Sequence, residues 1–262
     1  MDPLVLMLVS PIGMIAAGVA AVVFWRREAQ PSYRWFWIGA ALWTVAVAVK
    51  FAIAIPANGP VVNVLNENVS HPMMVLLGGL FIGVESSLTE IGFTLAAVMI
   101  WRQLGQDSNR AIAIGLGAGA FEAVLLGALS LIGLLVALSG IAGTEGVEAQ
   151  LMKTSQATPL IMLVGPVERL IAIACHASSR ALVLLGFVHR RVGMVLGGFA
   201  IFTLIDAIAG GAHLTGKLGE FSVWWIELMI LPCALISLPI LAWCHRKWGS
   251  DPNAAIESTK PD

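Results

Sequence analysis

The residues of this chain that could do chemistry lie where charge is expensive, inside long apolar stretches of the sequence. An ionisable side chain deep in a membrane-spanning helix costs about 2.5 to 3.5 kcal/mol or more, so each one is a candidate for a functional site. The candidates, in chain order, are Glu85, Glu90, Glu122, Glu168, Arg169, His176, Arg180 and Asp206.

Spacing groups several of these residues on one helix face. In the apolar stretch 159–188, Arg169, His176 and Arg180 follow one another at intervals of seven and four residues. These intervals place the three side chains on a shared face, with Glu168 one position away from it. We therefore expect this stretch to contribute most to a polar interior.

The stretch 72–101 carries two carboxylates at a less favourable spacing. Glu85 and Glu90 are five residues apart, which is about 140° around the axis at about 100° per residue. Only one of them can face the centre squarely. We expect that residue to be Glu90, while Glu85 belongs to the surrounding polar cluster.

Two kinds of chemistry fit these residues. In the first, buried ion pairs lock the helices together, and two arginines neutralise Glu122, Glu168 or Asp206. In the second, the residues form a metal or acid–base site, in which a neutral imidazole and carboxylates are ligands and another glutamate activates water. His176 fits either a hydrogen-bonded core position or a metal ligand, and both interpretations stay open here.

The elements that must position these residues are helices long enough to cross a membrane. Hydrophobic residues make up 58% of the chain and charged residues 12%, whereas about a quarter of a typical soluble domain is charged. A crossing helix needs about 20 apolar residues. Seven stretches qualify: 4–25, 35–55, 72–101, 111–139, 159–188, 192–211 and 222–244.

The sequence therefore predicts an all-α, polytopic membrane bundle of about seven transmembrane helices. We expect a single helical domain over residues 1–248 and a disordered cytoplasmic tail over 249–262. The segment from Pro56 to His71 contains Asn58-Gly59-Pro60 and is rich in asparagine, which predicts a polar surface loop. Lys50 then lies near the end of its helix, close enough to reach the interface or pair locally.

The basic residues predict the orientation. Ten of them lie at alternate connections and at the C-terminal end: Arg26, Arg27, Arg34, Arg102, Arg110, Arg190, Arg191, Arg246, Lys247 and Lys260. The opposite side holds Lys153 and Lys217. Since basic loops stay in the cytoplasm, we expect an outside N-terminus and a cytoplasmic C-terminus in the bacterial inner membrane. The partner is the lipid bilayer, and a net charge of -1 argues against nucleic acid.

Three segments resemble motifs of the YhfC family of intramembrane metalloproteases, which is related to the CAAX-processing and bacteriocin-processing group. The segment GLGAGAFEAVLLG, from Gly115 to Gly127, is similar to the family's Gly-x-Gly-His-Gly-Gly-x-Glu-Ala motif. Glu168-Arg169 followed by His176 resembles its Glu-Arg helix, and VESSLTEIG from Val84 resembles its Glu-Glu-x-x-Arg helix. The similarity covers about residues 70 to 210.

The resemblance implies hydrolysis of a peptide bond within or beside the membrane, with zinc as the cofactor. By this resemblance, Glu90 or Glu122 would activate water. His176, Asp206 and Glu122 would hold the metal.

The chain departs from the family pattern at positions that matter for this chemistry. Ala118 and Phe202 stand where the family carries histidines, and Thr89 and Phe93 replace a glutamate and an arginine. A zinc site usually needs three protein ligands plus water. The sequence therefore favours a degenerate site that binds or scaffolds a membrane-protein or peptide partner. Two alternatives are an active metal-dependent intramembrane peptidase and a structural subunit of a membrane complex or a permease.

Overall fold

The computed structural model describes residues 6–139, 146, 153, 158–218, 220 and 222–248. Across these residues the chain is helical and contains no strand. The long helices are α2 (Val9–Ala29), α3 (Tyr33–Asn68), α4 (His71–Ile100), α5 (Ser108–Leu138), α7 (Val164–Val188), α8 (Val192–Leu214) and α9 (Trp224–Trp248). Two short 3-10 helices, η1 (Arg102–Gly105) and η2 (Ile161–Leu163), precede α5 and α7.

Seven helices are long and apolar enough to cross a membrane, where η2 and α7 count as one span. The predicted all-α bundle of about seven spans is therefore confirmed. The tail predicted at 249–262 lies outside the described residues.

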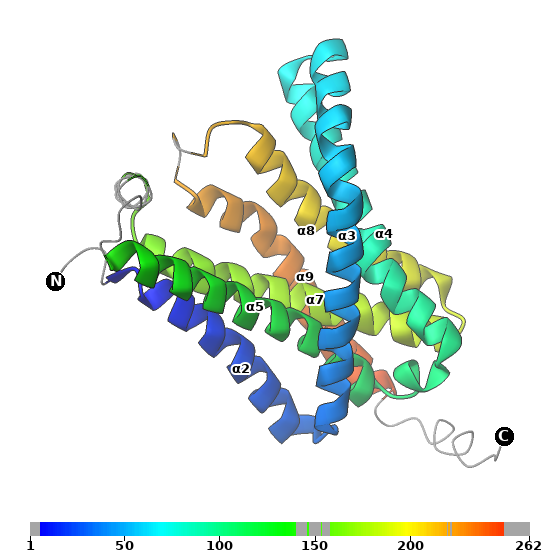
Figure 1. Ribbon diagram of the computed structural model, residues 1–262. Helices are drawn as coiled ribbons and strands as arrows, with labels where there is room; N and C mark the ends of the chain where they lie inside the picture. The colour runs from blue at the N-terminus through cyan, green and yellow to red at the C-terminus, as the bar shows by residue number, and fades with distance from the viewer. Residues whose placement is uncertain are drawn as a thin grey trace.

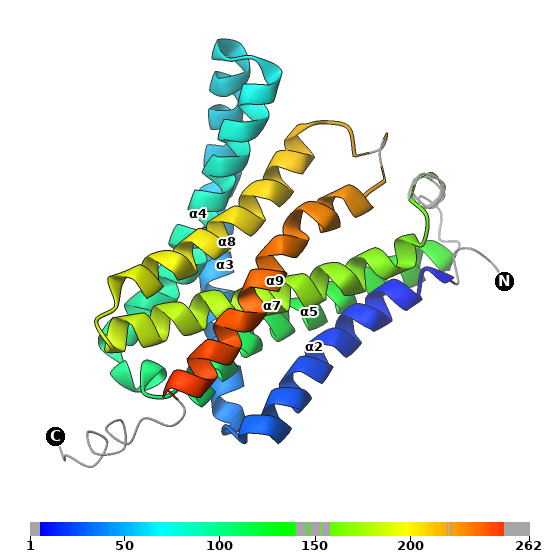
Figure 2. The same cartoon turned by 180° about the vertical axis from the view of Figure 1, so that it is seen from behind.

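Helix α7 is the centre of the bundle. It packs against α2, α4, α5, α8 and α9, and Figures 1 and 2 show it between α5 on one side and α9 on the other. Nearly all side chains from Arg169 to Gly186 are buried. A helix buried on all sides can carry charged groups only if neighbouring helices supply their partners.

Close approach of α5 to α7 depends on glycine. A β-carbon at Gly115 would lie 2.6 Å from the Ala177 α-carbon, and one at Gly119 would lie 2.9 Å from the Ile173 α-carbon. Backbone atoms cannot move aside as a flexible side chain can, so the absence of a side chain lets the two helices touch. This contact sets Glu122, one turn after Gly119, against the polar face of α7.

The prediction of a loop from Pro56 to His71 is wrong. Helix α3 runs without a break through Pro56 and Pro60 to Asn68, and α4 begins at His71. Proline lacks the backbone N–H that an α-helix uses, but helices of membrane proteins tolerate it because neighbouring helices, polar side chains and local adjustments satisfy the freed backbone groups. Lys50 consequently lies near the middle of α3 and not near its end.

The extended α3 forms a long hairpin with α4. At 1.5 Å per residue its 36 residues span about 54 Å, against a hydrocarbon thickness of about 30 Å. The paired ends of the two helices, around residues 60–75, reach beyond the other helices at the top of Figure 1. Most side chains of residues 51–68 are exposed or half-buried, so this half of the hairpin either tilts in the bilayer or projects from it.

If each of the seven helices crosses the membrane once, the two chain ends lie on opposite sides, and the basic residues predict which side is which. We expect a reporter fused after residue 262 to signal a cytoplasmic location, and a reporter fused before residue 1 to signal the outside, because ten basic residues lie on one side and two on the other. Two reporters, one active only in the cytoplasm and the other only outside it, measure the location of each end. A periplasmic signal from the C-terminal fusion would contradict the orientation.

Candidate functional site

Nine polar side chains from five helices form one continuous series of contacts in the interior of the bundle. We call this set the charge cluster. Its members are Lys50 of α3, Ser86 and Glu90 of α4, Glu122 of α5, Glu168, Arg169, His176 and Arg180 of α7, and Asp206 of α8.

Glu122 joins α5 to α7 through both of its carboxylate oxygens. One oxygen lies 2.5 Å from a guanidinium nitrogen of Arg169, and the other lies 2.7 Å from Nε2 of His176. The same guanidinium also contacts Glu168. Arg169 and His176, which lie on one face of α7, therefore hold the Glu122 carboxylate from two sides.

The contacts of His176 determine the position of its proton. A guanidinium nitrogen of Arg180 lies 2.6 Å from Nδ1 of the imidazole. Arginine can only donate hydrogen bonds, so Nδ1 accepts and carries no proton. We therefore assign a neutral ring whose Nε2–H donates to Glu122, which leaves neither ring nitrogen with a free lone pair.

The second half of the charge cluster joins α7 to α3, α4 and α8. Arg180 reaches one oxygen of Glu90 at 3.3 Å, and Nζ of Lys50 lies 3.2 Å from the other. The same Nζ lies 3.3 Å from Asp206 Oδ2 and 2.5 Å from the hydroxyl oxygen of Ser86, which donates in turn to Asp206. Each carboxylate of the set thus has a positively charged partner or a donor on another residue.

Burial makes these pairings necessary. The side chain of Arg180 is fully buried and that of Glu90 is 4% exposed, whereas Lys50 and Asp206 are 25% and 28% exposed. An unpaired charge at a buried position would lower the free energy of unfolding by several kcal/mol. Removing one partner of a buried ion pair has an effect of about this size. With a neutral imidazole, four carboxylates face three fixed cations, so the set carries one excess negative charge.

Sequence reasoning missed two members, Lys50 and Ser86. Lys50 was placed near a helix end because α3 was predicted to stop before Pro56. Ser86 lies four residues before Glu90 and therefore on the same helix face, a signal that could have identified it. Glu85, by contrast, faces Asn58 of α3 and makes no hydrogen bond or ion pair to the charge cluster among the contacts of the described chain.

Ala118 and Phe202 are the two residues that the motif resemblance predicts at family histidine positions, and both are buried. Ala118 is fully buried in α5. The ring of Phe202 stands edge-to-face against His176, with centroids 4.9 Å apart, and the Arg180 guanidinium lies 5.4 Å from its centre. Phe202 therefore packs against the imidazole of His176 and beneath the guanidinium of Arg180.

The residues present do not fit a zinc ion. Within the described ranges, no three His, Cys, Asp or Glu side chains are placed to hold a metal. A ligand must offer a free lone pair, and imidazole must bind through an unprotonated nitrogen. Here the acceptor nitrogen of His176 is occupied by Arg180, and the Glu122 oxygens are occupied by Arg169 and His176.

A serine–lysine hydrolase does not fit either, although the Ser86 hydroxyl lies 2.5 Å from Lys50. Such an enzyme needs a hydroxyl that can attack a substrate carbonyl. Ser86 is fully buried, and its proton already goes to Asp206. The contact is therefore a structural one.

A lateral cleft of about 520 Å³ gives access to the charge cluster between α3 and α5. Its floor contains Lys50, Glu90, Glu122, His176 and Asp206. Its walls are mostly apolar: Trp43, Thr44, Val47, Ala48, Phe51, Leu125, Leu126, Leu129 and Phe202. Several wall residues, such as Phe51 and Leu129, are more than half exposed on the outer surface of the bundle, so the cleft opens toward lipid.

A smaller cavity of about 60 Å³ lies on the other side of the charge cluster, between α7, α8 and α9. Glu122, Arg169, His176 and Asp206 are among its lining residues. A polar cavity of this size has room for a few water molecules. Polar atoms of the charge cluster that face it can therefore be hydrated.

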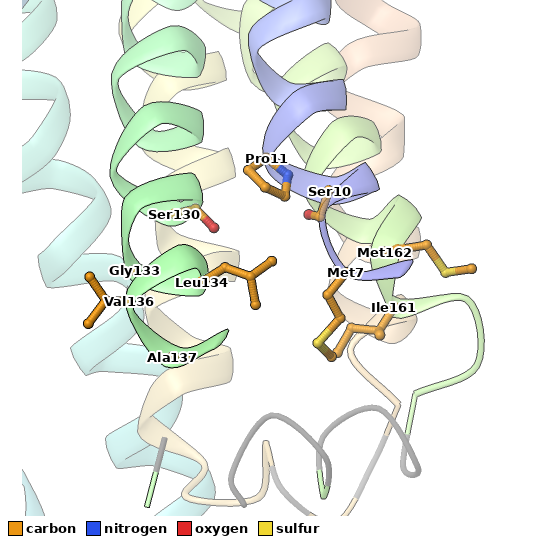
Figure 3. Close-up of a pocket in the computed structure, with 10 residues that line it drawn as sticks. All are labelled: Met7, Ser10, Pro11, Ser130, Gly133, Leu134, Val136, Ala137, Ile161 and Met162. Atoms are coloured by element: carbon orange, nitrogen blue, oxygen red, sulfur yellow. The ribbon is translucent and has the colours of Figure 1, made fainter. Parts of the chain in front are cut away.

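A further cavity, of about 530 Å³, lies apart from the charge cluster at the end of the bundle. Figure 3 shows it between the start of α2, the end of α5 and η2, with Leu134 pointing from α5 toward α2. Ser10 and Ser130 supply its hydroxyl groups, and none of its described lining residues is ionisable. It offers apolar volume but no group that could act as an acid, a base or a metal ligand.

Residues 13–230 match the model of the family described as YhfC intramembrane metalloprotease. The match extends beyond residues 70 to 210, which carry the motif resemblance. No curated protein and no solved structure matches the chain.

Proposed function

Because this chain belongs to the YhfC intramembrane metalloprotease family, we propose that it is a degenerate member that binds or scaffolds a membrane partner without cleaving it. It is a membrane protein with seven helices long and apolar enough to span the bilayer. The bacterial inner membrane is its proposed location. The family is described as a metalloprotease. Whether this chain retains that activity depends on the residues of its own site.

The observation that carries the proposal is the pairing of the candidate catalytic residues with cations of the chain itself. Glu90 contacts Lys50 and Arg180, and Glu122 contacts Arg169. A glutamate that activates water must have an oxygen free to accept its proton. Both glutamates use their oxygens in ion pairs or hydrogen bonds, so neither is poised as a general base.

The lateral cleft supports the binding role. Its apolar walls suit an apolar segment that enters from the lipid, and its polar floor can discriminate among segments by hydrogen bonding. The excess negative charge of the charge cluster favours a hydrogen-bond donor or a basic group over an acidic one. A partner segment is therefore expected to present a hydrogen-bond donor toward the carboxylate of Asp206.

The alternative of an active metal-dependent peptidase is supported by family membership itself. It requires Arg180 to leave Nδ1 of His176 and Arg169 to release Glu122, so that these groups become available to a metal. A structural subunit or a permease is the remaining alternative, in which the same charges form a fixed or proton-carrying network.

Metal analysis combined with a cleavage assay tests the degenerate site. We expect purified protein to contain far less than one zinc per chain and to leave a reconstituted membrane peptide intact, because the donor atoms that zinc needs are already paired. Glu122→Gln and His176→Ala should change no cleavage reaction. Zinc-dependent cleavage that either substitution abolishes, in a protein that still folds, would show the proposal to be wrong.

A further inference from the structure

An apolar groove of about 380 Å³ lies between α2 and α3, with α5 as its floor. Helices α2 and α3 both pack against α5 but contact each other little. Figure 1 shows the two helices diverging from the turn that joins them. We call this space the α2–α3 groove, and none of its described lining residues belongs to the charge cluster.

The α2–α3 groove opens toward lipid. Val19 of α2 and Trp37 of α3 line it, and their side chains are 52% and 69% exposed. Tyr33 and Trp37 supply the polar side-chain atoms of its described lining, which is otherwise apolar. The volume is within the range of pockets that hold a small ligand, about 300 to 1,000 Å³. Such a groove suits a flexible apolar chain, such as the acyl chain of a lipid.

Basic side chains lie at the end of the α2–α3 groove where α2 ends and α3 begins. Arg26 follows Val19 by seven residues and Val22 by four, so it continues the face of α2 that lines the groove. The central guanidinium carbon of Arg26 lies 5.2 Å from the centre of the Tyr33 ring. Arg34, the next residue after Tyr33, is exposed. This end of the groove therefore carries positive charge.

The charge at this end is not neutralised by the protein. No ion pair joins Arg26, Arg27 or Arg34 to a carboxylate in the part of the chain that the structure describes. The adjacent acidic residue in the sequence is Glu28, so three arginines and one glutamate leave two positive charges. Nε of Arg26 is buried and has no hydrogen-bond partner among the described residues, although most buried polar atoms have one. The arginines are therefore available to an anion from outside the chain.

We propose that the α2–α3 groove binds one anionic phospholipid, with an acyl chain between α2 and α3 and the phosphate beside Arg26 and Arg34. Guanidinium groups donate paired hydrogen bonds to phosphate oxygens, and basic pockets between membrane-spanning helices bind anionic head groups. Tyr33 and Trp37 are of the residue types that lie at the level of the head groups.

The charge favours a lipid over a second copy of this chain as the occupant. Copies inserted in the same orientation carry their basic ends at the same level of the membrane. A second copy in the groove would therefore bring more arginines toward Arg26 and Arg34, and like charges repel. A neutral lipid would fill the apolar part and leave both arginines without an anion.

Lipid retention by the purified full chain tests the proposal. The protein in neutral detergent is incubated with dioleoylphosphatidylglycerol or with dioleoylphosphatidylcholine, which has the same acyl chains, and bound lipid is counted by native mass spectrometry. We expect about one phosphatidylglycerol per chain, bound at least about tenfold more tightly than phosphatidylcholine at low salt, because each arginine near an anionic lipid contributes several-fold. Salt should reduce this preference. Equal affinity of the wild-type chain for both lipids would overturn the proposal.

Paired arginine variants locate the head group. Arg26→Gln combined with Arg34→Gln should remove most of the preference for phosphatidylglycerol. The matched control is Arg190→Gln combined with Arg191→Gln, which removes two exposed charges from the connection between α7 and α8 and should leave the preference unchanged. An equal loss in both double variants would mean that the net charge, and not the α2–α3 groove, selects the lipid, and would overturn the proposal.

A groove-filling variant tests the place of the acyl chain without changing charge. Val23 lines the α2–α3 groove and is 38% exposed, so Val23→Trp should fill part of the groove and lower phosphatidylglycerol retention several-fold. Val45→Trp, at an exposed position of α3 outside the groove, should retain lipid like wild type. If Val23→Trp instead changes the oligomeric state and leaves lipid retention unchanged, the occupant is a second copy and the proposal is wrong.

Discussion

Replacement of Arg180 by leucine is expected to lower the free energy of unfolding by about 3 to 5 kcal/mol, the cost of breaking a buried ion pair by removing one partner. The Arg180 side chain is fully buried and connects Glu90 to His176. Without it, Nδ1 of His176 loses its donor and Glu90 keeps Lys50 as its cation. Equilibrium unfolding of the purified protein in detergent measures the change.

Two further variants distinguish the effect of breaking the buried ion pair from the effect of removing any arginine. Arg102→Leu removes the charge of an exposed side chain at the start of the 3-10 helix η1 and should change stability by less than about 0.5 kcal/mol, as is usual at exposed positions. Arg180→Lys keeps the charge but cannot reach two acceptors with a planar fork, so an intermediate loss is expected. Equal stability of Arg180→Leu and Arg102→Leu would contradict the role given to Arg180.

Replacement of Glu122 by leucine is expected to have the second large effect, also about 3 kcal/mol or more. This change removes the acceptor of the His176 N–H and one of the two carboxylates beside Arg169. Glu168, whose side chain is 42% exposed, remains as the partner of Arg169, which is why we expect a somewhat smaller loss than for Arg180. Glu122→Gln keeps an oxygen acceptor and should be less harmful.

A double-mutant cycle gives the sharpest form of this prediction. Glu122→Leu combined with Arg169→Leu removes both members of the pair, and apolar replacement of a whole buried pair is often close to neutral. The double variant should therefore be more stable than the sum of the single effects predicts, with a coupling energy of about 1 to 3 kcal/mol. Strictly additive effects would mean that the two side chains do not interact in the folded protein.

The helices could be predicted from the sequence because their signal is simple. A stretch of about 20 apolar residues has few alternatives to a crossing helix, and the seven predicted stretches correspond to the seven long helices. The end of α3 could not be predicted in this way. Pro56, Gly59 and Pro60 are typical of a turn, whereas helices of membrane proteins can continue through proline when other groups satisfy the freed backbone groups.

The charge cluster could be predicted in part. The spacing of Arg169, His176 and Arg180 placed these residues on one face, and the structure brings all three together with Glu90, Glu122 and Asp206. The pairing itself could not be derived, because the rotation of each helix about its axis decides which charges meet. The error at the end of α3 then removed Lys50 from consideration. The catalytic and metal-binding roles inferred for Glu90, Glu122, His176 and Asp206 stay predictions.

The distribution of the charge cluster along the chain has a consequence for the insertion of the protein during synthesis. Lys50 of α3 and Glu90 of α4 can neutralise each other as soon as that hairpin has formed. Glu122 of α5 has its partners on α7, 47 residues later at Arg169 and further on at His176. During translation α5 must therefore wait at the insertion machinery, or enter the bilayer with its carboxyl group protonated, until α7 arrives. The order of the helices in the chain thus makes the membrane integration of α5 dependent on α7.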